Sequence, residues 1–235
     1  MNNHHQKILL ELSKYQTITG NKEEKHNKYI GSNKVSHVMN TKRKIEIAKQ
    51  LLKNNPKLSP ADYINLLNSL FDGKSHTELS IASKILEYSP KLRRHIQPNL
   101  LNKWLSNAEG WSEVDSICQS NFKADEILSN WSEWKKIIAK FVIDKNIHKR
   151  RASLVLLTYP VSKSDNKRLS NLAFTNIDKL KKEKNILITK AISWLLRSLV
   201  ANHREEIKIY LKKNKNNLPR IAIRETTRKL ITGKK

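Results

Sequence analysis

Glycine and proline are scarce in this sequence. Five glycines and six prolines stand among 235 residues, less than half of the share of about 12% that the two residues have in average proteins. β-Sandwiches, β-barrels and Rossmann sheets need many tight turns, so the scarcity argues against all three. It also excludes collagen and Gly/Pro-rich low-complexity chains.

Cysteine is nearly missing, with Cys118 as the single example. One cysteine excludes a disulfide scaffold and any cysteine-based zinc finger. The eight histidines show no spacing typical of metal ligands, so we expect no metal site. The glycine-rich phosphate-binding motifs and the G-x-S-x-G motif are missing too, which leaves nucleotide hydrolysis and serine esterase chemistry without support.

Long hydrophobic runs are also missing. No stretch reaches the 18 or so apolar residues of a membrane-spanning helix. The first residues, Met1 to Lys7, contain no basic segment followed by an apolar one, so we expect no signal peptide. These observations predict a soluble, cytoplasmic protein without a membrane partner.

Positive charge is in large excess. Lys and Arg total 46 against 21 Asp and Glu, which gives a formal net charge of +25. Such a charge fits DNA or RNA, an anionic membrane surface or an acidic protein as partner. The plain alternative is a proteome that is rich in Lys and Asn throughout. We favour nucleic acid, because this excess is typical of nucleic-acid-binding chains.

Apolar residues recur at steps of three and four along most of the chain, which predicts one helix after another. Segment 1–40 is a polar leader with one expected helix, 7–15, and 41–235 is expected to be a single domain. Ser59-Pro60 and the capping box Ser75-His76-Thr77-Glu78 mark two helix starts. The later helices are expected at 111–120, 125–143, 146–159 (closed by Pro160), 165–182, 185–202, 205–214 and 219–232.

Helix pairs recur at a spacing of roughly 35–45 residues, the period of HEAT-like repeats. The spacing therefore predicts an all-α, HEAT-like repeat solenoid. Stacked pairs curve into a solenoid with a concave face. If that face is basic, it can follow a DNA duplex by its phosphates.

Trp111 and Asp115 are four residues apart, so they share one face of a helix. Their plain interpretation is a core tryptophan beside a capping or ion-paired aspartate. Their functional interpretation is an aromatic wall with a carboxylate beside it. That pair suits a positively charged transition state, because a ring face attracts a cation and a carboxylate stabilises it.

Basic residues gather at three further places. Arg150 and Arg151 precede an apolar helix, where they are either solvated or bound to phosphate. Trp194 lies beside an apolar stripe, with Lys190 and Arg197 one turn away. This pattern fits a tryptophan exposed in a groove and a tryptophan in the core equally well. Arg224 belongs to a ridge of three arginines, with Arg220 and Arg228, that is either solvated or in contact with a nucleic-acid backbone. Two other tryptophans, Trp131 and Trp134, are expected in the core.

Together these segments resemble the DNA alkylation repair enzyme family, the AlkD-like glycosylases built from HEAT-like repeats. The most specific matches are the Trp111–Asp115 pair and the string Lys-Ala-Ile-Ser-Trp-Leu-Leu-Arg at 190–197. The matching segments are 67–71 with 75–78, 111–116, 150–153, 190–197, and 218–219 with 223–225.

The resemblance implies an enzyme that grips duplex DNA and hydrolyses the N-glycosidic bond of N3- and N7-alkylated purines. The family uses no metal and no organic cofactor, and it holds the deoxyribose of the lesion without a pocket for the base. The expected partner is double-stranded DNA containing alkylated bases, bound by a monomer associated with the nucleoid.

By position, the resemblance gives Asp115 the role of stabilising the charged sugar and positioning water. Trp111 and Trp194 would pack on the sugar and backbone, and Arg151 would hold the flanking phosphate and support the cleft. The basic residues also expected to bind DNA are Arg150, Lys190, Arg197 and Arg224. The alternatives are a catalytically inactive HEAT-like protein that binds DNA or structured nucleic acid, and a scaffold for acidic proteins or lipid headgroups.

Overall fold

The computed structural model describes residues 2–234, which form 15 helices and, besides them, two isolated β-bridges. These residues divide into two compact units, with the boundary after Ile117. The all-α prediction is confirmed. Within the described residues, no helix combines the length and apolar character needed to cross a bilayer. The basic concave face, and a single domain from residue 41, stay predictions.

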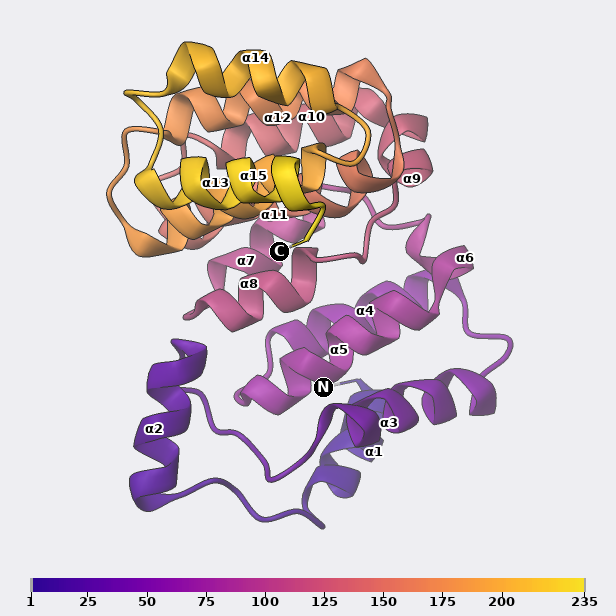
Figure 1. Ribbon diagram of the computed structural model, residues 1–235. Coiled ribbons are helices and arrows are strands. Elements are labelled where there is room, and N and C mark those ends of the chain that lie inside the picture. The colour runs from indigo at the N-terminus through magenta and orange to yellow at the C-terminus, as the bar shows by residue number, and fades with distance from the viewer. Residues whose placement is uncertain (1, 235) are drawn as a thin grey trace. The chain divides into compact units, whose positions relative to one another are not determined.

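The first unit is built around α5, which packs against both α3 and α4, while α1 packs against α4. Figure 1 shows α4 and α5 side by side. Its helices are α1 (Asn3–Leu12), α2 (Gly20–Ile30), α3 (Thr41–Asn54), α4 (Pro60–Phe71), α5 (His76–Tyr88), α6 (Pro90–Arg93), α7 (Leu100–Ser106) and α8 (Trp111–Cys118), the last residue of which begins the second unit.

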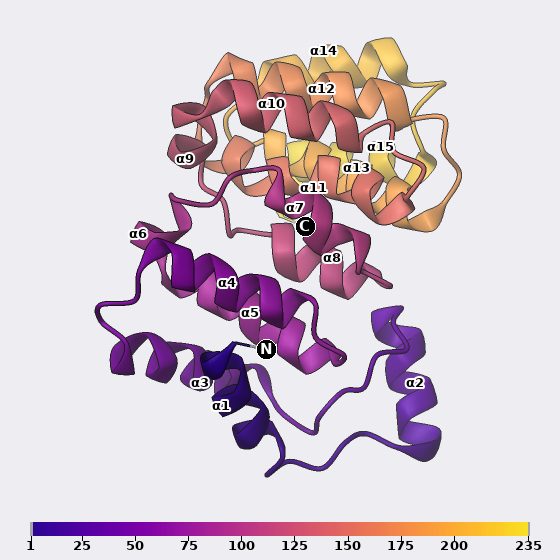
Figure 2. The same cartoon turned by 180° about the vertical axis from the view of Figure 1, so that it is seen from behind.

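The second unit has two rows of helices. One row holds α10, α12 and α14, and the other holds α11, α13 and α15 (Figures 1 and 2). Within the second row α13 packs against both α11 and α15. The helices are α9 (Ala124–Ser129), α10 (Trp131–Phe141), α11 (Ile147–Lys163), α12 (Lys167–Leu180), α13 (Ile186–Leu199), α14 (Arg204–Asn214) and α15 (Arg220–Thr232).

Both helix starts that the sequence predicts are present. The Ser59 hydroxyl accepts a hydrogen bond from the Asp62 amide at 3.1 Å, with Pro60 as the first residue of α4. Ser75 accepts from the Glu78 amide at 3.1 Å, and Glu78 accepts from the Ser75 amide at 2.8 Å. Each bond satisfies an amide that the helix itself leaves without a partner.

The prediction of a single helix at 125–143 is wrong. The chain forms α9 and α10 instead, separated by Asn130, whose φ of −126° and ψ of 49° are not helical. Asparagine adopts such angles readily because its side chain competes for backbone hydrogen bonds. Trp134 is buried as expected, whereas Trp131 is only half-buried.

Pro160 does not close its helix, contrary to the sequence prediction. Helix α11 continues through Pro160 to Lys163. The proline lies in the last turn, where it removes one backbone hydrogen bond and its fixed φ still fits a helix. Pro160 and Val161 are both buried, and this packing outweighs the missing bond.

The leader contains two helices, not one. Helix α1 begins earlier than expected, because the Asn2 side chain caps it by accepting from the His4 amide at 2.8 Å. Helix α2 was not predicted. Its sequence is almost entirely polar and Ile30 is its one buried residue, so it carries no apolar periodicity to detect.

A buried polar contact fixes α1 on the first unit. His5 lies within 2.7 Å of the Ser69 hydroxyl through Nδ1 and within 2.8 Å of Glu78 Oε1 through Nε2. The side chains of His5 and Glu78 are almost completely buried. Burial by itself raises the pKa of Glu78, but hydrogen bonds from His5 and Ser75 outweigh it, and the pKa lies below its usual value.

We expect Glu78→Gln to lower the free energy of unfolding at neutral pH by about 1–3 kcal/mol, because a buried hydrogen-bonded charge is removed. A lowered folded-state pKa contributes stability that is present above the unfolded value of about 4.3 and disappears as pH falls through the folded value. The wild type should therefore lose more stability on acidification than the variant. Urea unfolding at neutral pH and at about pH 3 measures both effects.

Glu87→Gln is the matched control for this prediction. Glu87 also lies on α5, but its ion pair with Lys84 is much more exposed, with 38% of the Glu87 side chain accessible to solvent, and such ion pairs contribute only about 0–1 kcal/mol. Equal decreases of stability in the two variants would contradict a structural role for the His5–Glu78 pair.

Candidate functional site

Helix α8 carries Trp111 and Asp115 on its first turns, on one face as the sequence predicts. Both side chains are half-buried, so neither is sealed in the interior. The helix is short, and Ser120 after it has a left-handed φ of 60°. Trp111 is the first residue of this short helix. The contacts at the start of α8 therefore determine where the pair lies.

Tyr29 contacts Trp111 in two ways. The indole Nε1 donates a hydrogen bond to the Tyr29 carbonyl at 2.8 Å. The two rings meet edge to face, with centroids 5.8 Å apart and planes at 85°, a favourable aromatic geometry. Tyr29 is 71% exposed, which is high for a large aromatic side chain. Sequence reasoning assigned it no role, since a single tyrosine on a polar helix gives no periodic signal.

Two glycines allow α2 and α8 to approach closely. Gly31 ends α2 with a φ of 72°, a conformation that favours glycine. A Cβ on Gly110 would lie 2.4 Å from the Gly31 carbonyl oxygen and 2.5 Å from that of Ile30. The backbone at Gly110 therefore contacts the backbone at the end of α2. Any larger residue at 110 would force these two segments apart.

A buried carboxylate fixes the start of α8. Glu113 is completely buried and accepts hydrogen bonds from the Ser32 hydroxyl at 2.5 Å, the Lys34 ammonium at 3.2 Å and the Glu109 amide at 2.8 Å. These donors come from the loop after α2 and from the turn before α8. The contacts hold the first turn of α8 in place, and Trp111 and Asp115 with it.

The other six predicted site residues belong to the second unit, and all come from one row of helices. Arg150 and Arg151 lie on α11, Lys190, Trp194 and Arg197 on α13, and Arg224 on α15. These helices pack side by side in the order α11, α13, α15, as Figures 1 and 2 show. The packing thus gathers residues that are separated by up to 74 positions in sequence (224 minus 150).

Three of the arginines hold the second unit together. Arg151 is 5% exposed and donates to the Leu187 carbonyl at 2.6 Å, which ties α11 to the start of α13. Arg150 pairs with Glu183 at 2.8 Å. Arg197 pairs with Glu225 on α15 at 3.4 Å. The contacts of Arg151 and Arg197 therefore connect neighbouring helices within the second unit.

The remaining basic residues are available at the surface. Lys190 and Arg224 are exposed, and within residues 2–234 neither lies within 4 Å of a carboxylate. Arg220 and Arg228 are exposed on α15 as well, so the predicted ridge of three arginines faces solvent. Trp194, on the neighbouring helix α13, is half-buried.

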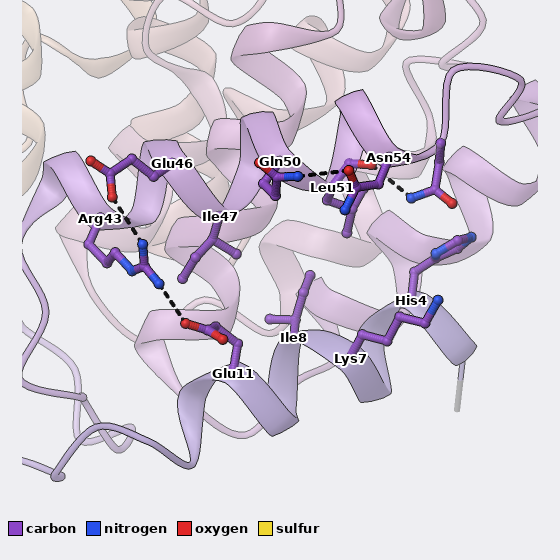
Figure 3. A pocket seen from close by; sticks show the side chains of 11 residues that line it. His4, Lys7, Ile8, Glu11, Arg43, Glu46, Ile47, Gln50, Leu51 and Asn54 are labelled. Atoms are coloured by element: carbon purple, nitrogen blue, oxygen red, sulfur yellow. Dashed lines mark hydrogen bonds and ion pairs between the residues drawn. The ribbon is translucent and has the colours of Figure 1, made fainter.

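A recess of about 570 Å³ lies between α1 and α3 in the first unit. Arg43 bridges Glu11 and Glu46 at one end of it, and Ile8, Ile47 and Leu51 form its apolar part (Figure 3). Among the described residues, none of the predicted site residues lines this recess. Nor do residues 2–234 contain a group of three His, Cys, Asp or Glu side chains that could hold a metal ion.

Comparison with known proteins identifies a family, and it finds solved structures of similar fold. The model of the family described as "DNA alkylation repair enzyme" matches residues 12–230. A solved structure titled "Predicted DNA alkylation repair enzyme from Enterococcus faecalis" is similar in fold, with a TM-score of 0.74 and 18% sequence identity, over 93% of this chain and 99% of that one. No curated protein matches the sequence significantly.

Proposed function

The chain belongs to the DNA alkylation repair enzyme family, and we propose that it is a DNA glycosylase acting on cationic N3- and N7-alkylated purines in duplex DNA. The observation that carries this proposal is the Trp111–Asp115 pair on the first turns of α8, held there by the buried Glu113. A carboxylate in a fixed position beside an aromatic face is what stabilisation of a cationic sugar requires.

The chemistry of the lesion explains why so few groups are needed. An N3- or N7-alkylpurine already carries a positive charge, so it leaves without protonation by a general acid. The remaining barrier is the positive charge that develops on the sugar as the glycosidic bond breaks. Asp115 stabilises that charge and positions the water that attacks the sugar. The products are the free alkylpurine and an abasic site.

The second unit contributes DNA binding in this proposal. Trp194 packs against the sugar and backbone near the lesion. Lys190 and Arg224 neutralise phosphates, because they are exposed cations without a carboxylate partner among the described residues. Arg151 connects α11 to the start of α13 through its bond to the Leu187 carbonyl. The ion pair of Arg150 with Glu183 connects α11 to the loop before α13, and that of Arg197 with Glu225 connects α13 to α15.

Incubation with methylated duplex DNA tests the proposal. We expect release of N7-methylguanine and N3-methyladenine, with the same rate in the presence and absence of EDTA, since no step uses a metal ion. The measurement is chromatography of the released bases. Binding of the duplex without release of either base would favour the catalytically inactive DNA-binding protein, and inhibition by EDTA would contradict the mechanism.

A further inference from the structure

Three histidines and a lysine line a second recess of the first unit, of about 460 Å³. His26 comes from α2, Lys44 from α3 and His76 from the first residue of α5, while His37 lies in the loop between α2 and α3. Segments distant in sequence thus bring four nitrogen bases to one recess. The glycosylase reaction proposed above uses none of them.

Serine contacts orient two of the rings. His26 Nε2 lies 3.1 Å from the Ser36 hydroxyl, and His76 Nε2 lies 3.0 Å from the Ser112 hydroxyl. Nδ1 of His76 lies 3.5 Å from the Ser80 hydroxyl, so both nitrogens of this ring are engaged. The rings of His26 and His76 meet edge to face with centroids 6.3 Å apart. Nδ1 of His37 is buried and has no hydrogen-bond partner among the described residues. The recess is therefore ordered and keeps unused hydrogen-bonding capacity.

The lining residues of the recess include no carboxylate. Burial lowers the pKa of Lys44, and within residues 2–234 its ammonium makes no ion pair. Burial, followed by the charge of Lys44, lowers the pKa of His26 and brings that of His76 to about 4. A half-buried cation that makes no ion pair is uncommon, because buried charges are normally paired.

The charged and titratable groups around the recess come from every neighbouring element. For His37, burial lowers the pKa, and the charge of Glu78 opposes this in part. Glu78 itself is engaged by His5 and Ser75. The groups that these interactions involve are His5 on α1, His26 on α2, Lys34 and His37 in the following loop, Lys44 on α3, and His76, Glu78 and Lys84 on α5.

We propose that this recess binds a tetrahedral oxyanion, a phosphate group, held by Lys44 and His37 with the rings of His26 and His76 beside it. A phosphate accepts hydrogen bonds from several directions, and the recess offers the Lys44 ammonium, Nδ1 of His37 and the Asn40 side-chain amide. It also supplies the negative charge that the lining lacks. The phosphate is either free in solution or part of a nucleic-acid backbone, and the experiment below separates these sources.

Histidine ring NMR signals report occupancy without any need for base release. Sulfate is the first probe, because it stays doubly charged over the pH range in which histidine titrates. Titration at about pH 6 should shift the ring signals of His26, His37 and His76 saturably. Binding should weaken towards about pH 8, because the bound anion favours protonated rings. Chloride at equal ionic strength should leave the signals unchanged. Inorganic phosphate should give the same shifts as sulfate.

Lys44→Met should weaken sulfate binding by about tenfold or more, since it removes a charged hydrogen-bond donor. Lys42→Met is the matched control: Lys42 is exposed on the same helix and does not line the recess. Should Lys44→Met fail to fold, His37→Gln serves as the second variant, with circular dichroism confirming the fold. Unsaturable shifts, or equal affinities in Lys44→Met and Lys42→Met, would overturn the proposal.

A short undamaged duplex identifies the source of the phosphate. If a backbone phosphate occupies the recess, the duplex shifts the same three rings and displaces sulfate. If free phosphate is the ligand, sulfate still shifts the rings when the duplex is bound. Both readouts are independent of catalysis, so they test this proposal even if the protein releases no alkylpurine. A failure to bind sulfate would equally leave the glycosylase proposal standing.

Discussion

Asp115→Asn is expected to slow release of alkylpurines by about 10²–10³-fold, the usual effect of removing one well-placed electrostatic group from an active site. Asparagine has nearly the same shape and keeps a hydrogen-bonding oxygen, so α8 and the packing of Trp111 on Tyr29 should persist. Only the negative charge that we propose to stabilise the developing sugar cation is removed. The affinity for duplex DNA should stay the same or rise slightly, because a charge that repels phosphate is gone.

Single-turnover release of N7-methylguanine and fluorescence anisotropy of a labelled duplex measure the two quantities separately. Asp165→Asn is the matched control, since Asp165 is exposed in the loop between α11 and α12 and the same charge is removed there. The control should release bases at the wild-type rate. A normal rate in Asp115→Asn would remove this carboxylate from the mechanism, and a joint decrease of rate and binding would indicate a structural role instead.

DNA affinity should fall steeply with salt. A protein that neutralises six to ten phosphates loses about 10³–10⁵ in affinity between 50 and 200 mM salt, because binding releases condensed counterions. A net charge of +25 supplies more than enough cations for that number of phosphates. We therefore expect a linear fall of log affinity with log salt in anisotropy titrations. A flat response would contradict binding by the phosphate backbone.

The structure indicates which cations should contribute to the salt dependence of DNA affinity. Replacing Lys190 and Arg224 together by glutamine should reduce the magnitude of the salt slope by about two, because two fewer phosphates are neutralised. Lys57→Gln removes one charge from an exposed loop position of the first unit and should leave the slope nearly unchanged. An unchanged slope in the double variant would remove Lys190 and Arg224 from the DNA-binding surface.

Arg150 and Arg197 illustrate what a sequence pattern leaves open. Each lies in a basic segment that suits phosphate binding, yet in the structure each pairs with a glutamate, Glu183 and Glu225 respectively. Both glutamates are more than 25 residues away along the chain. A local pattern contains no information about partners at that distance, so the number of arginines available to DNA could not be predicted.

The same reasoning applies to the first unit. Trp111 and Asp115 were placed on one helix face from their spacing alone, since four residues are about one helical turn. Tyr29, Gly31 and the buried Glu113 were not identified as parts of this cluster. Their roles depend on the approach of α2 to α8 across some 80 residues of sequence.

The sequence by itself determined the helix content, two of the helix starts and the placement of Trp111 and Asp115 on one helix face. Each of these depends on interactions within a few residues of chain. Only tertiary packing decided three other features. They are the continuation of α11 through Pro160, the existence of the polar helix α2, and the gathering of three histidines around Lys44. Burial and pairing across long stretches of chain set the free energies at these places, and they outweigh the local preferences of the residues involved.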